Sequence, residues 1–149
     1  MIYSIGHSIK NIKSFISKLQ EFSIDTLVDI RTYPSSRYNP QFNRCNLENV
    51  LPKSNIKYLY RGKSLGGLGV NIRYDETIKE MCTLSEKENI CLMCSEGDPL
   101  KCHRAQTIEP SVNELGYTMK HILWETTPGK PVQVDPEPVK PENEQQKLF

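Results

Sequence analysis

The hydrophobic and polar positions along this chain follow two alternating spacings. Short apolar runs that end in polar turns predict β-strands, whereas apolar residues recurring every three or four positions predict amphipathic helices. The expected strands are residues 1–5, 27–31, 56–60, 90–94 and 119–123. The expected helices span 12–22, lie near 46–51, follow Asp75 and run from 102 to about 115, and the glycine-rich residues 61–70 are expected to form a loop. Strands that alternate with helices predict a parallel sheet covered on both faces.

The pattern predicts one α/β domain over residues 1–125, with a three-layer, Rossmann-like or flavodoxin-like architecture and a mainly parallel sheet of about five strands. Residues 90–94 are apolar or thiol throughout, so they should form the central strand, buried on both faces. Asn11 and Asp75 are the expected N-caps of their helices. Pro110 should kink or split its helix, because proline removes one helical hydrogen bond and crowds the preceding turn.

The composition changes at Thr126. Five of the ten prolines lie between Thr126 and Gln146, and this stretch has almost no large apolar side chain. Such a segment cannot bury enough surface to offset the entropy lost on ordering. Residues 126–149 are therefore expected to form a disordered, proline-rich tail.

Charge and cysteine content narrow the class of protein. Lysine and arginine number 19 against 18 acidic residues, so any contact with nucleic acid must be local rather than driven by a global basic field. The sequence has no apolar run of membrane-spanning length and no signal-peptide pattern, so we expect a cytoplasmic protein with no membrane contact. The five cysteines are an odd number without secretory context, which favours thiols over disulfides.

Polar and ionisable residues that could bind a ligand or take part in catalysis follow the expected strands. In a parallel sheet the C-terminal ends of all strands lie at one edge, so the residues after them converge in a crevice. The stretch 90–104 is the expected centre, because six polar residues follow its strand within ten positions. The expected site contains His7, Ser8, Asp29, Arg31, Arg37, Tyr38, Cys94, Glu96, Asp98, His103 and Arg104.

Two classes of function fit this crevice. The first is a hydrolase or lyase acting on a nucleotide or nucleic acid, for which the expected acid or base residues are Asp29, His7, Glu96 and Asp98. The second is a non-catalytic module that binds the same ligands. In both classes, the expected anion-binding residues are Ser8, Arg31, Arg37, Tyr38, His103 and Arg104. Arginine suits this role because one guanidinium group can bind two phosphate oxygens at once. Asp29 could instead form an ion pair with Arg31 or Arg104 that only satisfies the end of its strand. His7 could be a turn residue that hydrogen-bonds to the backbone.

Cys94 also has two interpretations. A thiol at the end of a strand, before a turn into a helix, suits a nucleophile. Phosphatase loops, however, place an arginine six residues after the cysteine, where this chain has Leu100, and this favours a buried structural thiol. A zinc site built from Cys91, Cys94, Cys102 and His103 is disfavoured, because residues three apart on a strand point to opposite faces. No metal and no cofactor are expected.

Three separated pieces resemble a known family. They are Ser4–Ser8, the pair Val28–Arg31 and Pro34–Phe42, and Cys94–Pro99 with Cys102–Arg104; the Leu65–Gly67 turn fits as well. In this order and spacing they resemble the "domain of unknown function" family numbered 488, over roughly residues 1–125. The resemblance implies a three-layer α/β fold and a role in DNA repair or nucleic-acid modification.

The last five residues resemble a second motif. Gln145–Phe149 is similar to the peptide that binds the bacterial sliding clamp, although the usual aliphatic second position is Gln146. The expected contacts are Gln145, Leu148 and Phe149, the last two being the only bulky apolar pair in the tail. We therefore expect a nucleotide- or nucleic-acid-directed protein linked to DNA repair or modification and tethered to the clamp, or alternatively a non-catalytic binding module using the same crevice.

Overall fold

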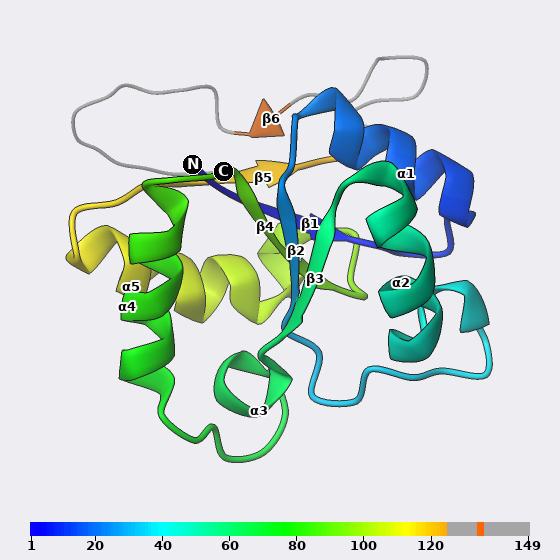
Figure 1. Ribbon diagram of the computed structural model, residues 1–149. Coiled ribbons are helices and arrows are strands. Elements are labelled where there is room, and N and C mark those ends of the chain that lie inside the picture. Colours follow the sequence, from blue (N-terminus) through cyan, green and yellow to red (C-terminus); the bar gives the residue numbers. More distant parts are fainter. Residues whose placement is uncertain (125–133, 136–149) are drawn as a thin grey trace.

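The computed structural model describes residues 1–124 and 134–135 (Figure 1). Apart from those last two residues, the expected tail at 126–149 lies outside the described residues, as does the whole peptide Gln145–Phe149. No helix within the described part of the chain is long and apolar enough to cross a membrane.

The centre of the fold is a six-stranded sheet in the order β3-β2-β4-β1-β5-β6. The first five strands are parallel and the sixth runs antiparallel to β5. The bounds are β1 (Ile2–Gly6), β2 (Thr26–Asp29), β3 (Lys57–Tyr60), β4 (Ile90–Cys94), β5 (Met119–Ile122) and β6 (Val134–Asp135). This arrangement confirms the predicted α/β class with five parallel strands. The two-residue β6 falls within the segment expected to be the tail.

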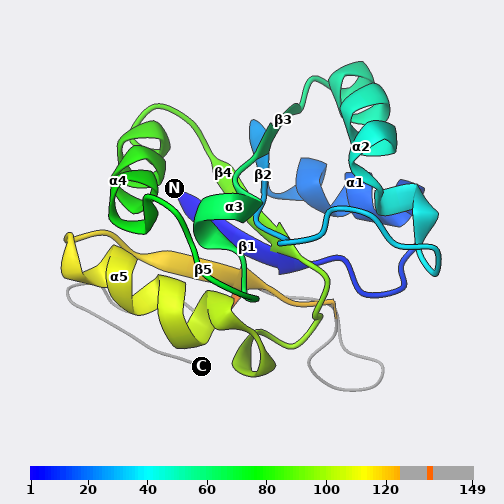
Figure 2. The same ribbon diagram turned by 90° about the horizontal axis from the view of Figure 1, so that it is seen from below.

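Helices cover both faces of the sheet and complete three layers (Figures 1 and 2). The bounds are α1 (Ile12–Glu21), α2 (Arg44–Val50), α3 (Gly62–Leu65), α4 (Tyr74–Ser85) and α5 (Glu109–Glu114). On one face, Phe15 and Leu19 of α1 and Leu47 of α2 pack in one apolar cluster. On the other face, α3, α4 and α5 contribute to a second cluster, in which Ile78 and Met81 are buried. Two hydrophobic cores therefore enclose one sheet.

The strand β4 is buried on both faces, as predicted. Cys91 and Met93 contribute to the core beside α1 and α2, whereas Ile90, Leu92 and Cys94 contribute to the core beside α4 and α5. Because side chains alternate along a strand, Cys91 and Cys94 lie on opposite sides of the sheet. The sequence argument against a zinc site that uses both thiols agrees with this placement.

One of the two predicted helix caps is confirmed. The side chain of Asn11 accepts a hydrogen bond from the backbone N–H of Ser14 at 2.8 Å and so caps α1. The prediction for Asp75 is wrong, because α4 begins at Tyr74 and its N-cap is Arg73, with a left-handed φ of 57°. Asp75 lies in the first turn, where its carboxylate faces the positive end of the helix dipole.

The prediction of a continuous loop at 61–70 is wrong in its first half. Gly62–Leu65 form the short helix α3, and the N–H of Gly66 donates to the carbonyl of Gly62 at 3.0 Å. A Cβ atom on Gly62 would lie 1.9 Å from the carbonyl oxygen of Arg31. Glycine at this position therefore allows two backbone segments to approach closely. The glycine-rich composition of residues 61–70 alone did not distinguish this requirement from loop flexibility.

The helical run after β4 is divided near Pro110, as predicted. Arg104–Ile108 form a π-helical segment, and α5 follows directly with Pro110 in its first turn. Proline is tolerated there, because the N–H groups of a first turn lack intrahelical partners. The π-helical segment and α5 therefore form one continuous helical run. Their backbone hydrogen bonds differ, from residue i to i+5 in the π segment and from i to i+4 in α5.

Candidate functional site

The loops after β1, β2 and β4 lie together at the C-terminal edge of the sheet. The N–H groups of His7 and Ser8 donate to the carbonyls of Cys94 and Ser95, both at 2.9 Å. From β2, the N–H of Ile30 donates to the carbonyl of Met93 at 3.0 Å. The convergence expected from a parallel sheet is therefore present, with the β4 loop in the middle.

Side-chain hydrogen bonds join further segments to this edge. Gln41 donates from Nε2 to the carbonyl of Lys10 at 2.8 Å, and the N–H of Leu68 donates to Oγ1 of Thr32 at 3.2 Å. We call the connected segments the loop rim, defined as residues 6–11, 29–43, 66–73 and 94–103. The rim is a set of loops that support one another rather than four independent ones.

Asp29 and Arg31 form a buried ion pair in the rim. Nε of Arg31 donates to Oδ1 of Asp29 at 2.8 Å and Nη2 donates to Oδ2 at 2.7 Å, while Nη2 also reaches the carbonyl of Phe42 at 2.7 Å. The hydroxyl of Tyr58 donates to Oδ2 of Asp29 at 2.5 Å. Burial, followed by this bond, raises the pKa of Tyr58 above its usual range. Of the alternatives for Asp29, pairing with Arg31 is the arrangement present.

Arg104 is fully buried and also bound internally. Nη1 donates to Oγ of Ser4 at 3.1 Å, Nη2 donates to the carbonyl of Glu96 at 2.7 Å, and Nε has no partner in the described structure. Arg104 therefore holds the loop after β4 against β1. Its position removes it from any surface at which a ligand could approach from solvent.

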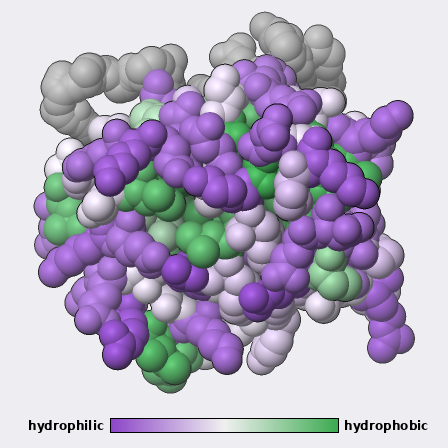
Figure 3. All heavy atoms as spheres, in the orientation of Figure 1, coloured by the Kyte–Doolittle hydropathy of each residue, from purple (hydrophilic) through white to green (hydrophobic). Residues whose placement is uncertain are grey.

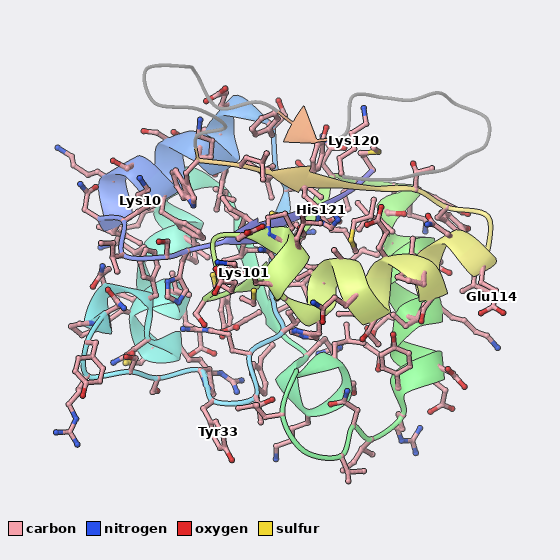
Figure 4. All side chains as sticks on the ribbon, turned by 180° about the vertical axis from the view of Figure 1, so that it is seen from behind. Lys10, Tyr33, Lys101, Glu114, Lys120 and His121 are labelled. Atoms are coloured by element: carbon pink, nitrogen blue, oxygen red, sulfur yellow. The ribbon has the colours of Figure 1, made fainter. Side chains whose placement is uncertain are left out.

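Three residues that sequence reasoning missed extend this polar network beneath the sheet. The hydroxyl of Ser4 lies 2.6 Å from Nδ1 of His121, and Nε2 of His121 lies 2.7 Å from a carboxylate oxygen of Glu109. Figure 4 shows His121 on β5, on the side of α5. The sequence contained one sign of this network, a polar residue inside each of two otherwise apolar predicted strands. These two residues, Ser4 and His121, are paired positions of β1 and β5.

Arg37 and Tyr38 lie on the outside of the rim. Arg37 is exposed and has no ion-pair partner within residues 1–124, while Tyr38 is 85% exposed. Tyr33, which the sequence analysis did not select, is 71% exposed and projects outward from the same loop (Figure 4). Of the three expected anion-binding arginines, Arg37 alone faces solvent.

His7 is buried in the rim against an aromatic ring. Its imidazole stacks on Phe42 with a centroid distance of 4.2 Å, and Nδ1 donates to the carbonyl of Ser8 at 2.7 Å. Burial, assisted by the charge of Arg31, lowers the pKa of His7 to about 4, against the opposing effect of the bond to Ser8. His7 is therefore neutral at neutral pH, with Nε2 as its unprotonated nitrogen.

Glu96 and Asp98 hold the turn that follows β4. Oε2 of Glu96 accepts from the N–H of Asp98 at 3.0 Å, and Oδ1 of Asp98 accepts from the N–H of Leu100 at 3.0 Å. Such bonds are those of a turn whose side chains replace missing backbone partners. The two carboxylates have structural partners of their own and do not bond to one another.

Two thiols and an imidazole form a compact group at the inner side of the rim. Sγ of Cys94 lies 2.9 Å from Sγ of Cys102, which in turn lies 3.4 Å from Nδ1 of His103. Nε2 of His103 donates to the carbonyl of Leu65 at 2.7 Å, and the absence of a side chain at Gly67 gives its ring room. Sequence reasoning placed Cys94 and His103 at the site but considered Cys102 only as a metal ligand.

The pKa values of the two thiols are shifted in opposite directions. The hydrogen bond from Cys94 lowers the pKa of Cys102 well below its usual range, against burial, with further help from His103, the charge of Arg104 and the backbone N–H of Arg104. The same bond, together with burial, raises the pKa of Cys94. Cys102 is therefore the thiol of the pair that ionises first.

The first prediction concerns Arg31. Replacing it with Met removes the cation and leaves the buried Asp29 carboxylate with only the Tyr58 hydroxyl and the backbone N–H of residue 31 as donors, so we expect a loss of about 3–5 kcal/mol in the free energy of unfolding. Arg37→Ala, at an exposed position of the same loop, should change it by less than about 0.5 kcal/mol. Urea unfolding followed by circular dichroism measures both. A small loss for Arg31→Met accompanied by weaker ligand binding would instead make Arg31 a ligand-binding residue.

The second prediction concerns His7 and pH. The pKa of His7 is lower in the folded protein than the ordinary value of about 6.5 in the unfolded chain, so the unfolded state binds the proton first as the pH falls. This contribution to stability is fully present above pH 6.5 and decreases between 6.5 and about 4, by about 3 kcal/mol. In His7→Gln, the difference in unfolding free energy between neutral and acid buffer should shrink by that amount. An unchanged difference would contradict the assignment.

The comparison with family models gives one result. Residues 11–74 match the family described as "Domain of unknown function DUF488". Searches of curated proteins and of solved structures return no match. The matched segment contains Asp29, Arg31 and Arg37 but ends before the thiols of the rim. The sequence resemblance to the DUF488 family is therefore confirmed over residues 11–74.

Proposed function

We propose that this protein binds a nucleotide or single-stranded nucleic acid at the outside of the loop rim, in the context of DNA repair or modification. The observation that carries the proposal is the exposure of Tyr33, Arg37 and Tyr38 on one loop at the C-terminal edge of the sheet. Two aromatic rings with a cation between them in sequence supply stacking surfaces for bases and a partner for phosphate.

The loop that carries these residues is well anchored. Its two ends are held by the Asp29–Arg31 ion pair and by the bond from Gln41 to Lys10, and Thr32 joins it to the loop after α3. Tyrosines presented from a supported loop lose little conformational freedom when a base stacks on them. The anchoring therefore supports a binding role for the exposed rings.

Other exposed rim residues have the chemistry that such a ligand needs. Leu68, Val70 and Ile72 are 61%, 92% and 61% exposed on the loop after α3, and Figure 3 shows a hydrophobic patch at the lower end of the molecule, where Figure 1 places this loop. Lys101, labelled in Figure 4, is exposed on the turn after β4. Apolar contacts for bases and a second cation for phosphate thus lie on the same rim.

The contacts of the carboxylates bear on the choice between the two classes of function considered for this crevice. Asp29 is neutralised by Arg31, and Glu96 and Asp98 bond to the backbone of their own turn. These contacts support the binding module over a hydrolase or lyase that uses carboxylates as acid and base. Incubation with a nucleotide or oligonucleotide, followed by product analysis, separates the alternatives.

The third prediction tests the rim. Tyr33→Ala and Tyr38→Ala should each weaken binding of fluorescently labelled single-stranded DNA by roughly 5- to 150-fold, as expected for about 1–3 kcal/mol of stacking per base. Arg37→Ala should lower the slope of log affinity against log salt by about 0.7, since one phosphate contact is lost. Fluorescence anisotropy measures all three.

The control for this experiment is Lys53→Ala. Lys53 is exposed on the turn before β3, at the opposite edge of the sheet, so its removal changes the net charge without touching the rim. Equal losses in Lys53→Ala and Arg37→Ala, with no effect of the tyrosines, would show non-specific attraction and contradict the proposal.

A second component of the proposal is tethering to a bacterial sliding clamp through Gln145, Leu148 and Phe149. Its support is the sequence similarity alone, because this peptide lies outside the described residues. The fourth prediction is that the full chain binds a purified clamp with a dissociation constant of about micromolar, as expected for a short peptide anchored by two apolar side chains. Leu148→Ala with Phe149→Ala should abolish binding, whereas Lys140→Ala should not. Equal binding by the double variant would refute the tether.

A further inference from the structure

A dithiol group at the inner side of the rim has chemistry that the proposed binding function does not use. We propose that Cys102 is a nucleophile for small hydroperoxides and that Cys94 is its resolving partner, so that the protein cycles between a dithiol and a Cys94–Cys102 disulfide. This redox activity goes beyond the proposed binding function and does not depend on it. It rests on the contacts of Cys94, Cys102, His103 and Arg104.

The distance between the two sulfurs allows direct bond formation. Sγ of Cys94 and Sγ of Cys102 lie 2.9 Å apart, compared with about 2.05 Å in a disulfide. Cys94 ends β4 and Cys102 directly precedes the helical run that begins at His103, so the backbone holds both thiols in place. The two cysteines therefore need little rearrangement to become bonded.

His103 is oriented to accept the proton of Cys102. A carbonyl oxygen only accepts hydrogen bonds, so the 2.7 Å contact with Leu65 places the proton on Nε2. Nδ1 then directs its lone pair toward Sγ of Cys102 at 3.4 Å. Fixing one ring nitrogen in this way selects the tautomer that acts as a base toward the thiol.

The surroundings distinguish the attacking sulfur from the resolving one. Sγ of Cys102 lies 2.9 Å from Sγ of Cys94 and 3.4 Å from Nδ1 of His103, and the charge and the backbone N–H of Arg104 stabilise a negative sulfur there. Sγ of Cys94 also lies 3.7 Å from the carbonyl oxygen of Glu96, which only accepts hydrogen bonds, so this contact retains the proton on Cys94. The geometry thus assigns the attack to Cys102 and the second step to Cys94.

The small exposure of the group restricts the size of its reactant. Cys94 is 5% exposed and Cys102 is 7% exposed, whereas His103 beside them is half-buried. A two-oxygen hydroperoxide group can reach such a sulfur more readily than a bulky disulfide. This favours peroxide reduction over thiol–disulfide exchange as the first step.

The proposed reaction balances in two steps. The Cys102 thiolate attacks one peroxide oxygen; an S–O bond forms, the O–O bond breaks, and the leaving oxygen takes the proton held by His103. The product is the sulfenic acid of Cys102. The sulfur of Cys94 then attacks Sγ of Cys102, the S–S bond forms, the S–O bond breaks, and the hydroxyl leaves as water with the Cys94 proton. Two thiols lose two electrons, the peroxide gains them, and a thiol reductant restores the dithiol.

The fifth prediction is tested with hydrogen peroxide on the full chain. One equivalent at neutral pH should give a product lighter by two hydrogens, and peptide mapping after alkylation should show Cys94 joined to Cys102. Cys94→Ser should instead accumulate a sulfenic acid on Cys102 that dimedone traps, and Cys102→Ser should react at neither position. Cys45→Ser, which removes an exposed thiol, should behave like the parent chain. His103→Gln should slow the oxidation and shift its pH profile to higher pH, because Cys102 loses its base.

Three results would overturn the proposal. The first is a parent chain that oxidises at Cys45 while Cys94 and Cys102 remain alkylatable, a measurement that needs no variant to fold. The second is dimedone labelling of Cys94 in Cys102→Ser as fast as the labelling of Cys102 in Cys94→Ser, which would contradict the assigned roles. The third is faster oxidation by oxidised glutathione than by hydrogen peroxide, which would replace the hydroperoxide by a disulfide substrate.

Discussion

The insertion of β4 between β1 and β2 is the constraint on which the rest of this structure depends. Every side chain of β4 is buried, so both of its neighbours must be strands and both of its faces must be covered by helices. Since all three strands are parallel, their C-terminal ends meet, and the loops after them bond to one another through backbone groups. The position of the rim is therefore a consequence of how one apolar strand is buried.

Burial at this edge also determines which polar residues remain available. Arg31 and Arg104 would be costly to bury unpaired, and both donate to nearby acceptors, a carboxylate for Arg31 and a hydroxyl and a carbonyl for Arg104. Both arginines consequently stabilise the loops. The side chains left for surface recognition are Arg37 and its aromatic neighbours. The reactive groups are the thiols of Cys94 and Cys102, which the surrounding hydrogen bonds make unequal in acidity.

The sequence predicted the elements of the fold better than the contacts of the site. Strand positions, the Asn11 cap and the division at Pro110 depend on local spacing and backbone chemistry, which the sequence contains directly. Parallel strands also predicted that the candidate residues would converge. The choice of Arg31 rather than Arg104 as the partner of Asp29, and the role of Cys102, depend on distances across the fold. The helix at Gly62 was missed for the same reason, because its glycine is required by the close approach of the Arg31 carbonyl in the loop after β2.

The antiparallel pairing of β6 with β5 has a consequence for self-association. Within the described residues it pairs with part of β5 and forms a two-residue edge strand on that side, while β3 is the edge strand on the other side. An uncovered strand can template hydrogen bonding with a neighbouring molecule, which leads to aggregation. β3 has only four residues, begins with the exposed Lys57, and ends with Tyr60, whose ring is covered by the guanidinium of Arg44 at 4.7 Å. A short edge with flanking cations disfavours the addition of another chain, and so opposes growth of the sheet beyond one molecule.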